Sequence, residues 1–247
     1  MIVCDLGDRW QVVLQTDHAD LSGAIARRWD GTTERSGSLI IAAERHDDGW
    51  AVWEQAPMCD PQTSKPVNFL EVGVLAHLAF YRAGIAAIGE QDVYAGLLVS
   101  MHGAGIYRGR YGSQPDLRLK FAEEAPEHVD AFVAEQEGGF AAGDAVAGVT
   151  AEERKRDYEL LQVYDRMSLL FCTNDTLAPP ATEFSGYRFE PDGGATVRMS
   201  PFPFEGAEAR FMLVRRLLPK RRWRDSEEFR REFFATEPER TEVTVAG

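Results

Sequence analysis

The segment SLIIAAERHDDGW at residues 38–50 begins with an apolar run. Two adjacent side chains that commonly bind metal ions, His46 and Asp47, follow that run. His18 and Asp165 lie at helical spacing on the apolar stripes of two other segments, LQTDHADLSGAI and QVYDRMSLLFC. Burying either aspartate as an unpaired charge would cost several kcal/mol, so each needs a cation or a protonated partner. These four side chains are therefore the first candidates for a shared buried site.

Two further histidines, His77 and His102, also lie on apolar faces, whereas His128 lies in an acidic stretch. A single histidine on such a face is most often a core residue with one hydrogen bond. Arg45 and Arg166 are close in sequence to the aspartates, but consecutive helix residues point about 100° apart and make poor partners. The joint pattern favours a metal site, and internal His–Asp hydrogen bonds are the alternative.

The candidate ligands come from separate segments, and the short zinc motif H-E-x-x-H is absent. Imidazole together with carboxylate suits a divalent transition metal such as Fe, Mn, Co or Zn. Glu44 and Glu71 could join the ligands, but solvated helix surface is the more common role for such residues. The predicted metal ligands, for one or two ions, are His18, His46, Asp47, His77, His102 and Asp165.

Helical periodicity predicts the segments that position these ligands. A capping box formed by Thr150 and Glu153 opens the clearest helix. The polar segment GTTERSGS at 31–38 should end the first helix. Helices are expected over residues 10–29, 39–47, 69–83, 91–101, 126–137 and 152–172.

After Asn174, short alternating runs such as GYRFE, ATVRM and ARFMLVRRL predict an antiparallel sheet, which the N-terminal run MIVCDL could join. We therefore expect a mainly α protein, α+β overall. A helical metal-binding domain should occupy residues 1–179. A small β-rich C-terminal appendage at residues 180–247 should pack on the same core.

The composition limits the partners. The 247 residues carry 40 Asp and Glu against 27 Lys and Arg, a formal charge of −13. Such a surface repels nucleic acid and anionic membranes, so neither is expected as a partner. Three scattered cysteines without a C-x-x-C pair suit a reducing cytoplasm. We expect a small-molecule substrate, and the sequence does not indicate an oligomeric state.

A glycine-rich segment, HGAGIYRGRYG, follows His102 but matches no phosphate-loop spacing. Its two arginines, Arg108 and Arg110, are candidates for binding a substrate phosphate next to the metal. An exposed loop without a ligand is the more common role for such a segment.

The order of His18, then His46-Asp47, then Asp165 resembles the H…HD…D signature of HD-type metal-dependent phosphohydrolases. The resemblance covers residues 10–175 and implies an HD-like helical bundle. It also implies that His18, His46, Asp47 and Asp165 hold the first metal, with Asp47 as a bridging carboxylate. His77 and His102 would bind a second metal or donate a proton to the leaving oxygen. Asp47, His77 and His102 are thus the implied catalytic residues.

At the level of the whole chain, LQTDHADLSGAIARRW, ERHDDGW, YDRMSLLFC and MSPFPF look like the family called domain of unknown function 3891. That family name implies no activity. The leading hypothesis is a metal-dependent phosphohydrolase acting on a small phosphorylated molecule or nucleotide. The alternative is a non-catalytic protein that binds or senses a metal or ligand.

Overall fold

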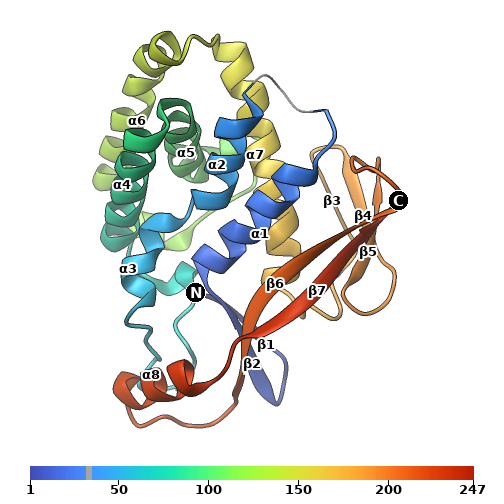
Figure 1. Cartoon of the computed structure of the whole chain (residues 1–247). Coiled ribbons are helices and arrows are strands. Elements are labelled where there is room, and N and C mark those ends of the chain that lie inside the picture. Colours follow the sequence, from blue (N-terminus) through green and yellow to red (C-terminus); the bar gives the residue numbers. More distant parts are fainter. Residues whose placement is uncertain (32–34) are drawn as a thin grey trace.

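Helices form one side of the molecule in the computed structural model, which describes residues 1–31 and 35–247 (Figure 1). The polar segment expected to end the first helix lies partly outside the described residues. The helices are α1 (Gln15–Arg28), α2 (Ser36–Arg45), α3 (Ala51–Glu54), α4 (Val74–Gln91), α5 (Val93–Gly105), α6 (Pro126–Ala147), α7 (Ala151–Cys172) and α8 (Ser226–Ala235).

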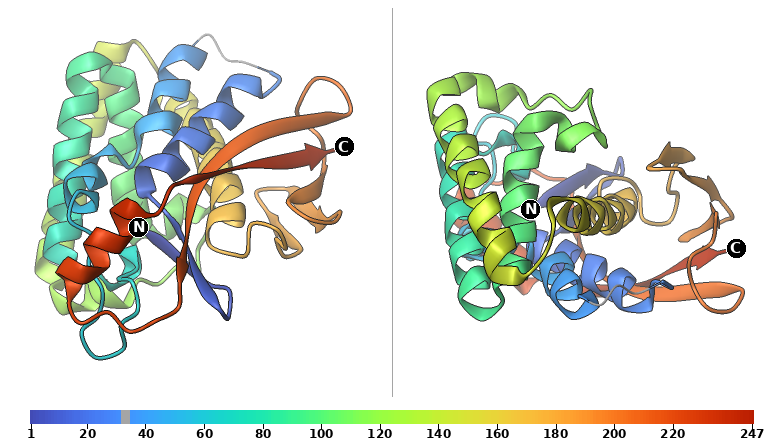
Figure 2. Two further views of the ribbon diagram at one scale, coloured as in Figure 1. Left: turned by 60° about the horizontal axis from the view of Figure 1, so that its bottom comes forward. Right: turned by 90° about the horizontal axis from the view of Figure 1, so that it is seen from above.

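A curled seven-stranded sheet forms the other side (Figures 1 and 2). Its order is β1-β2-β6-β7-β5-β4-β3, and all neighbours are antiparallel except the parallel pair of β5 and β7. The strands are β1 (Ile2–Asp5), β2 (Arg9–Val13), β3 (Thr182–Phe184), β4 (Tyr187–Pro191), β5 (Thr196–Ser200), β6 (Glu208–Pro219) and β7 (Glu239–Ala246).

The α+β class expected from the sequence is confirmed, but the expectation of a small antiparallel C-terminal appendage is wrong, because the sheet is mixed and has seven strands. The N-terminal run does join the sheet, as anticipated, and residues 9–13 form a second N-terminal strand beside β6. The sheet thus takes strands from both sides of residue 179 and curls as a half-barrel. The sequence prediction extended the first helix back to Trp10, because Trp10 and Leu14 share helical spacing with His18. The structure begins that helix at Gln15.

The remaining elements agree with the sequence in type and differ mainly at their ends. The helix expected over 69–83 begins later and runs further, and the one expected over 126–137 continues to Ala147. The capping box at Thr150 is present: the Thr150 hydroxyl accepts from the Glu153 amide, and the Glu153 carboxylate accepts from the Thr150 amide. No described helix is long and apolar enough to cross a membrane.

One core joins the helices to the sheet. Buried side chains of α1, α5 and α7 pack together with the inward-facing residues of β6 and β7, among them Ile25, Leu98, Phe171, Leu213 and Val243. A second cluster lies between α4, α5 and α6, and a third holds α8 against β2 and β6. Because α1, α5 and α7 are fixed by this common core, side chains on their facing surfaces keep a defined position.

Candidate metal centre

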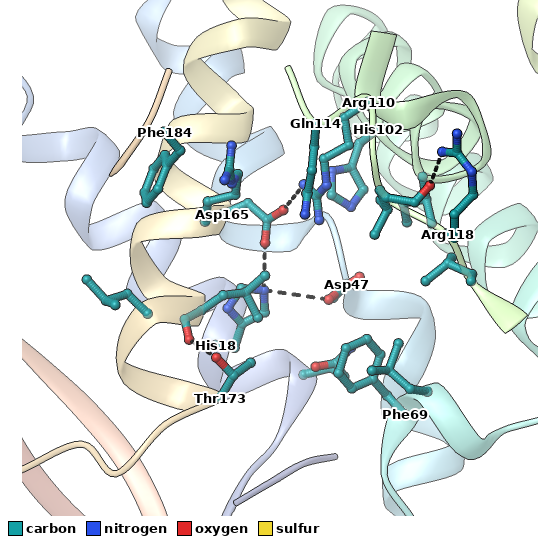
Figure 3. Close-up of a pocket in the computed structure, with 18 of the residues that line it drawn as sticks. His18, Asp47, Phe69, His102, Arg110, Gln114, Arg118, Asp165, Thr173 and Phe184 are labelled. Carbon is teal, nitrogen blue, oxygen red and sulfur yellow. Dashed lines mark hydrogen bonds and ion pairs between the residues drawn. The ribbon is translucent and has the colours of Figure 1, made fainter. Parts of the chain in front are cut away.

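Five of the six predicted metal ligands gather at one buried place between helices. Figure 3 shows four of them, His18, Asp47, His102 and Asp165. α1 carries His18, α5 carries His102, and α7 carries Asp165. His46 and Asp47 directly follow α2. Each of these side chains belongs to a residue that is at most 4% exposed.

Local contacts explain how the ligand segments reach this place. Glu54, itself buried, accepts hydrogen bonds from the backbone amides of Gln15 (2.6 Å) and Thr16 (3.5 Å) and so caps the start of α1. Gly49 lets the segment after Asp47 touch α4, since a Cβ there would lie 2.0 Å from the carbonyl oxygen of Phe80. The glycine of HDDG is thus required by a backbone contact.

The candidate ligand atoms lie close to the spacing that one bound ion would need. The Nε2 atoms of His18 and His46 are 3.1 Å apart, and His18 Nε2 is 3.2 Å from Asp165 Oδ1 and 3.8 Å from Asp47 Oδ2. His46 Nε2 is 3.7 Å and 3.6 Å from the same two oxygens. Ligands about 2.1 Å from an ion lie roughly 3.0–3.4 Å apart in octahedral or tetrahedral geometry. Small shifts would therefore complete the coordination.

Hydrogen bonds engage the outer nitrogens of His18 and His46, and the one to His46 fixes its tautomer. His46 Nδ1 contacts the carbonyl oxygen of Ala43 at 2.9 Å, and only a protonated nitrogen can donate to it. Ser168 Oγ contacts His18 Nδ1 and lies 2.9 Å from both the carbonyl oxygen of Asp165 and Ser22 Oγ; when its proton goes to that carbonyl, it accepts from a protonated His18 Nδ1. With these tautomers both neutral rings keep a free lone pair on Nε2 directed at the site, which is how metal-binding histidines are commonly oriented.

His102 has the opposite tautomer. Arginine can only donate, so Gln162 turns its carbonyl oxygen to Arg110 Nη1 at 2.5 Å. The amide nitrogen of Gln162 then faces His102 Nδ1 at 3.2 Å and donates to it. Neutral His102 consequently carries its proton on Nε2.

Charges at the site perturb the pKa values strongly. Burial disfavours the imidazolium of His46, but Asp47 and Asp165 outweigh it and raise the pKa of His46 to about 9. Burial would raise the pKa of Asp165, but Arg110 and the two histidines hold it well below its usual range. Burial and the neighbouring charge of His46 lower the pKa of His102 well below normal, so this ring is neutral.

The other three predicted site residues, His77, Arg108 and Arg110, are not part of the cluster of potential metal ligands. His77 lines the same pocket but belongs to neither group of potential ligands found among the described residues. Its Nδ1 lies 2.7 Å from the hydroxyl of Tyr107. Arg110 is buried against Asp165 and lines the pocket, whereas Arg108 is exposed and pairs with Glu137 at 3.3 Å.

A pocket of about 610 Å³ opens above the ligand cluster (Figure 3). Its floor is formed by His18, Asp47, His102 and Asp165. One part of the wall is apolar, and another carries cationic groups although the whole chain is acidic. The apolar residues include Phe69, Phe121, Leu169 and Phe184, and the cationic ones are Arg110, Arg118, Lys120 and Arg166.

Several residues of this site were not predicted from the sequence. Tyr81 donates its hydroxyl to Asp47 Oδ1 at 3.0 Å. It lies four residues after His77 on the same stripe. Gln162 and Ser168 lie three residues before and after Asp165, so helical spacing could have identified them. Phe184 comes from the sheet and stacks on Arg166 at 4.2 Å, a contact that the sequence does not signal.

No curated protein and no solved structure matches the chain. A family profile does, and it extends over residues 1–220 from the first strand to the end of β6. All five clustered residues and Arg110 fall within that range. The chain therefore belongs to the family described as protein of unknown function DUF3891.

Proposed function

We propose that the protein is a metal-dependent hydrolase that acts on a small phosphorylated molecule. The observation that carries this proposal is the convergence of His18 Nε2, His46 Nε2, Asp47 Oδ2 and Asp165 Oδ1 at the floor of an open pocket. Such a nitrogen and oxygen ligand set suits Mn, Fe, Co or Zn. The order of the ligands along the chain, which resembles that of HD-type phosphohydrolases, supports the same chemistry.

The pocket supports an anionic substrate. In a chain of formal charge −13, four cationic side chains line this one cavity. Arg166 is held over Phe184 and donates to the carbonyl oxygen of Ser113 at 3.2 Å, and it has no acidic partner among the described residues. A positioned arginine without a carboxylate is suited to binding phosphate. The apolar part of the wall would hold an uncharged portion of the substrate.

His18, His46, Asp47 and Asp165 would hold a divalent ion, which would supply an activated water and polarise a phosphoryl oxygen. The protein residues do the rest. Asp47 and Asp165 hold the ligand geometry, and Arg110 faces the negative charge that develops on the phosphoryl group. Neutral His102 offers its Nε2–H as a hydrogen bond to a substrate oxygen. The buried floor keeps bulk water away, which strengthens each of these interactions.

The test combines metal content with turnover. Purified protein should retain a divalent transition metal by elemental analysis, and His46→Ala and Asp165→Asn should each lose it, whereas an exposed-site control, Lys155→Ala, should not. Metal-loaded protein should hydrolyse at least one member of a panel of phosphomonoesters, phosphodiesters and nucleotides with Mn²⁺ or Fe²⁺. Unchanged metal content in both ligand variants would refute the site. Bound metal without any turnover would favour a metal-dependent binding or sensor protein.

A further inference from the structure

The site raises the question of how many ions it holds. Resting on the proposed function, we propose that the centre binds a single metal ion and that the guanidinium of Arg110 takes the place of a second cation. The argument depends on which ligand atoms remain free once the protein's own hydrogen bonds are counted.

Each of the two aspartates directs one oxygen at the histidines and has its other oxygen engaged by a donor of the protein. Tyr81 donates to Asp47 Oδ1 at 3.0 Å, and Asp47 Oδ2 faces the two histidines. Arg110 binds Asp165 Oδ2, and Asp165 Oδ1 faces the same histidines. A carboxylate that links two ions about 3.5–4 Å apart commonly gives one oxygen to each. Both carboxylates are therefore arranged as terminal ligands of one ion.

The histidines lead to the same conclusion. Two groups of potential ligands can be drawn, one with His18, His46 and Asp165 and one with His46, Asp47 and His102. Both need His46, whose Nδ1 is engaged by the Ala43 carbonyl, so only the single lone pair on Nε2 remains. That lone pair binds one ion. His102 has no lone pair on Nε2 in its neutral form, because Gln162 donates to its Nδ1.

Arg110 is placed by an unusual stretch of backbone. Residues 109–112 all have positive φ, with Arg110 at 50° and Tyr111 at 50°. This conformation costs a residue with a side chain roughly 1–2 kcal/mol, and such strain tends to persist at functional sites. Ser113 holds the segment by donating its amide (3.2 Å) and its hydroxyl (3.0 Å) to the Arg110 carbonyl. The chain thus reverses and directs the guanidinium inward.

Arg110 lines the pocket and has more donors than the one that holds Gln162 and Asp165. Its Nη1 serves both Gln162 and Asp165, while its Nε is buried without a partner among the described residues. An arginine is permanently charged and cannot be lost to solvent as a weakly bound ion can. One metal and one fixed guanidinium therefore flank the position where a phosphoryl group would bind.

The first experiment measures stoichiometry and needs no turnover. Titration of the metal-free protein with Mn²⁺ or Co²⁺, followed by calorimetry and elemental analysis, should give one ion per chain at saturation. The visible spectrum of the Co²⁺ form should be unchanged in His102→Asn, which keeps an acceptor for Gln162, and should change in His18→Ala. Two ions per chain, or a Co²⁺ spectrum altered by His102→Asn, would overturn the proposal.

The second experiment tests the role of Arg110 with inorganic phosphate as the probe. Arg110→Met should still bind one ion but bind phosphate about 10–100-fold more weakly, because a charged hydrogen bond is lost. Arg110→Lys, which retains a charge, should recover part of the affinity, and the exposed Arg82→Ala should behave as wild type. Undiminished phosphate binding in Arg110→Met would overturn the role of Arg110. Absence of ester hydrolysis in the wild type would instead refute the proposed hydrolase and leave the stoichiometry to be decided by titration.

Discussion

His46 and His77 are equally buried, at 2% exposure each, yet their environments drive their protonation in opposite directions. The pKa of His46 is raised to about 9, whereas burial lowers the pKa of His77 to about 3. Burial disfavours the charged ring at both positions. The difference comes from the neighbours: carboxylates surround one ring and aromatic groups surround the other.

The aromatic environment of His77 is built from Trp50, Tyr81 and Phe121, whose ring centroids lie 5.2, 5.0 and 4.9 Å from its own. No carboxylate lies within ion-pair distance of His77 among the described residues. His46 instead has Asp47 and Asp165 within 3.7 Å. A buried histidine is thus a candidate metal ligand here where carboxylates lie beside it, as they do beside His46. His77 is equally buried without such neighbours, and it only lines the pocket.

The largest expected effect is the pH dependence of metal binding. Below the pKa of about 9, the metal must displace a proton from His46, so the apparent affinity should fall about tenfold per pH unit. Between pH 8 and pH 6 the loss should be about 100-fold. Calorimetry in two buffers with different heats of ionisation would count the protons released.

The aromatic histidine provides the matched control for that titration. With a pKa of about 3, His77 stays neutral from pH 6 to pH 8 and cannot contribute to the proton release. His77→Phe should therefore leave the slope of affinity against pH unchanged. A pH-independent affinity in the wild type, or a slope that vanishes in His77→Phe, would reverse the roles assigned to the two rings.

A smaller effect is expected at Tyr81, which belongs to both environments. Its ring packs on His77, and its hydroxyl donates to Asp47 Oδ1. Tyr81→Phe should weaken metal binding by about tenfold, the lower end of what the loss of such an orienting bond costs. Tyr107→Phe removes only the bond to His77 Nδ1, so it should lower the free energy of unfolding by about 1 kcal/mol without changing metal affinity.

Chelator competition and urea unfolding on both variants would separate these outcomes. If Tyr107→Phe weakened metal binding as much as Tyr81→Phe, the two environments would be energetically coupled. The contrast between a charged cluster and an inert aromatic wall would then be incorrect.

The sequence is enough to predict that most of the clustered His and Asp residues face the core. It is not enough to predict which charged or aromatic groups surround each histidine. His18, His46, Asp47, His102 and Asp165 all fall at apolar helical positions, and helices with such stripes pack them inward. His77 has the same signal, because the identity of its neighbours depends on tertiary packing. Arg110 is a candidate phosphate ligand from sequence, but its burial against Asp165 is not evident there, because it depends on left-handed backbone at two residues with side chains.

The sheet, too, is predictable from the sequence in its local elements but not in its long-range pairings. Alternating runs identify β4, β5 and β6, because a period of two is a local property. The extent of the sheet depends on pairings between distant segments, such as β2 with β6 and the parallel pair of β5 with β7. These pairings decide that the N-terminal strands and the C-terminal region share one sheet, and no local pattern reports them.

The smallest expected effect concerns a partly buried carboxyl group outside the cluster. It extends the comparison of buried environments from histidines to aspartates. Asp17 precedes His18 on α1, and burial together with the nearby charge of Glu54 raises its pKa to about 6, whereas Asp165 is shifted downward by its cationic partners. A carboxyl whose pKa is raised on folding favours the folded state while it is protonated. This contribution is present below about pH 4 and is lost as the pH rises through 6.

Asp17→Asn should therefore stabilise the protein at pH 7.5, and only about a third of that gain should remain at pH 4.5. The full shift would correspond to about 3 kcal/mol, but solvent screening of this partly exposed group reduces the expected gain to about 1 kcal/mol. Urea unfolding at both pH values would measure it, with the exposed Asp130→Asn expected to stay within about 0.5 kcal/mol of wild type. A loss of stability at pH 7.5 would mean that Asp17 has a favourable charged partner. The environment would then favour the charged form of Asp17, as it does for Asp165. The contrast between a carboxyl group outside the cluster and one inside it would not hold.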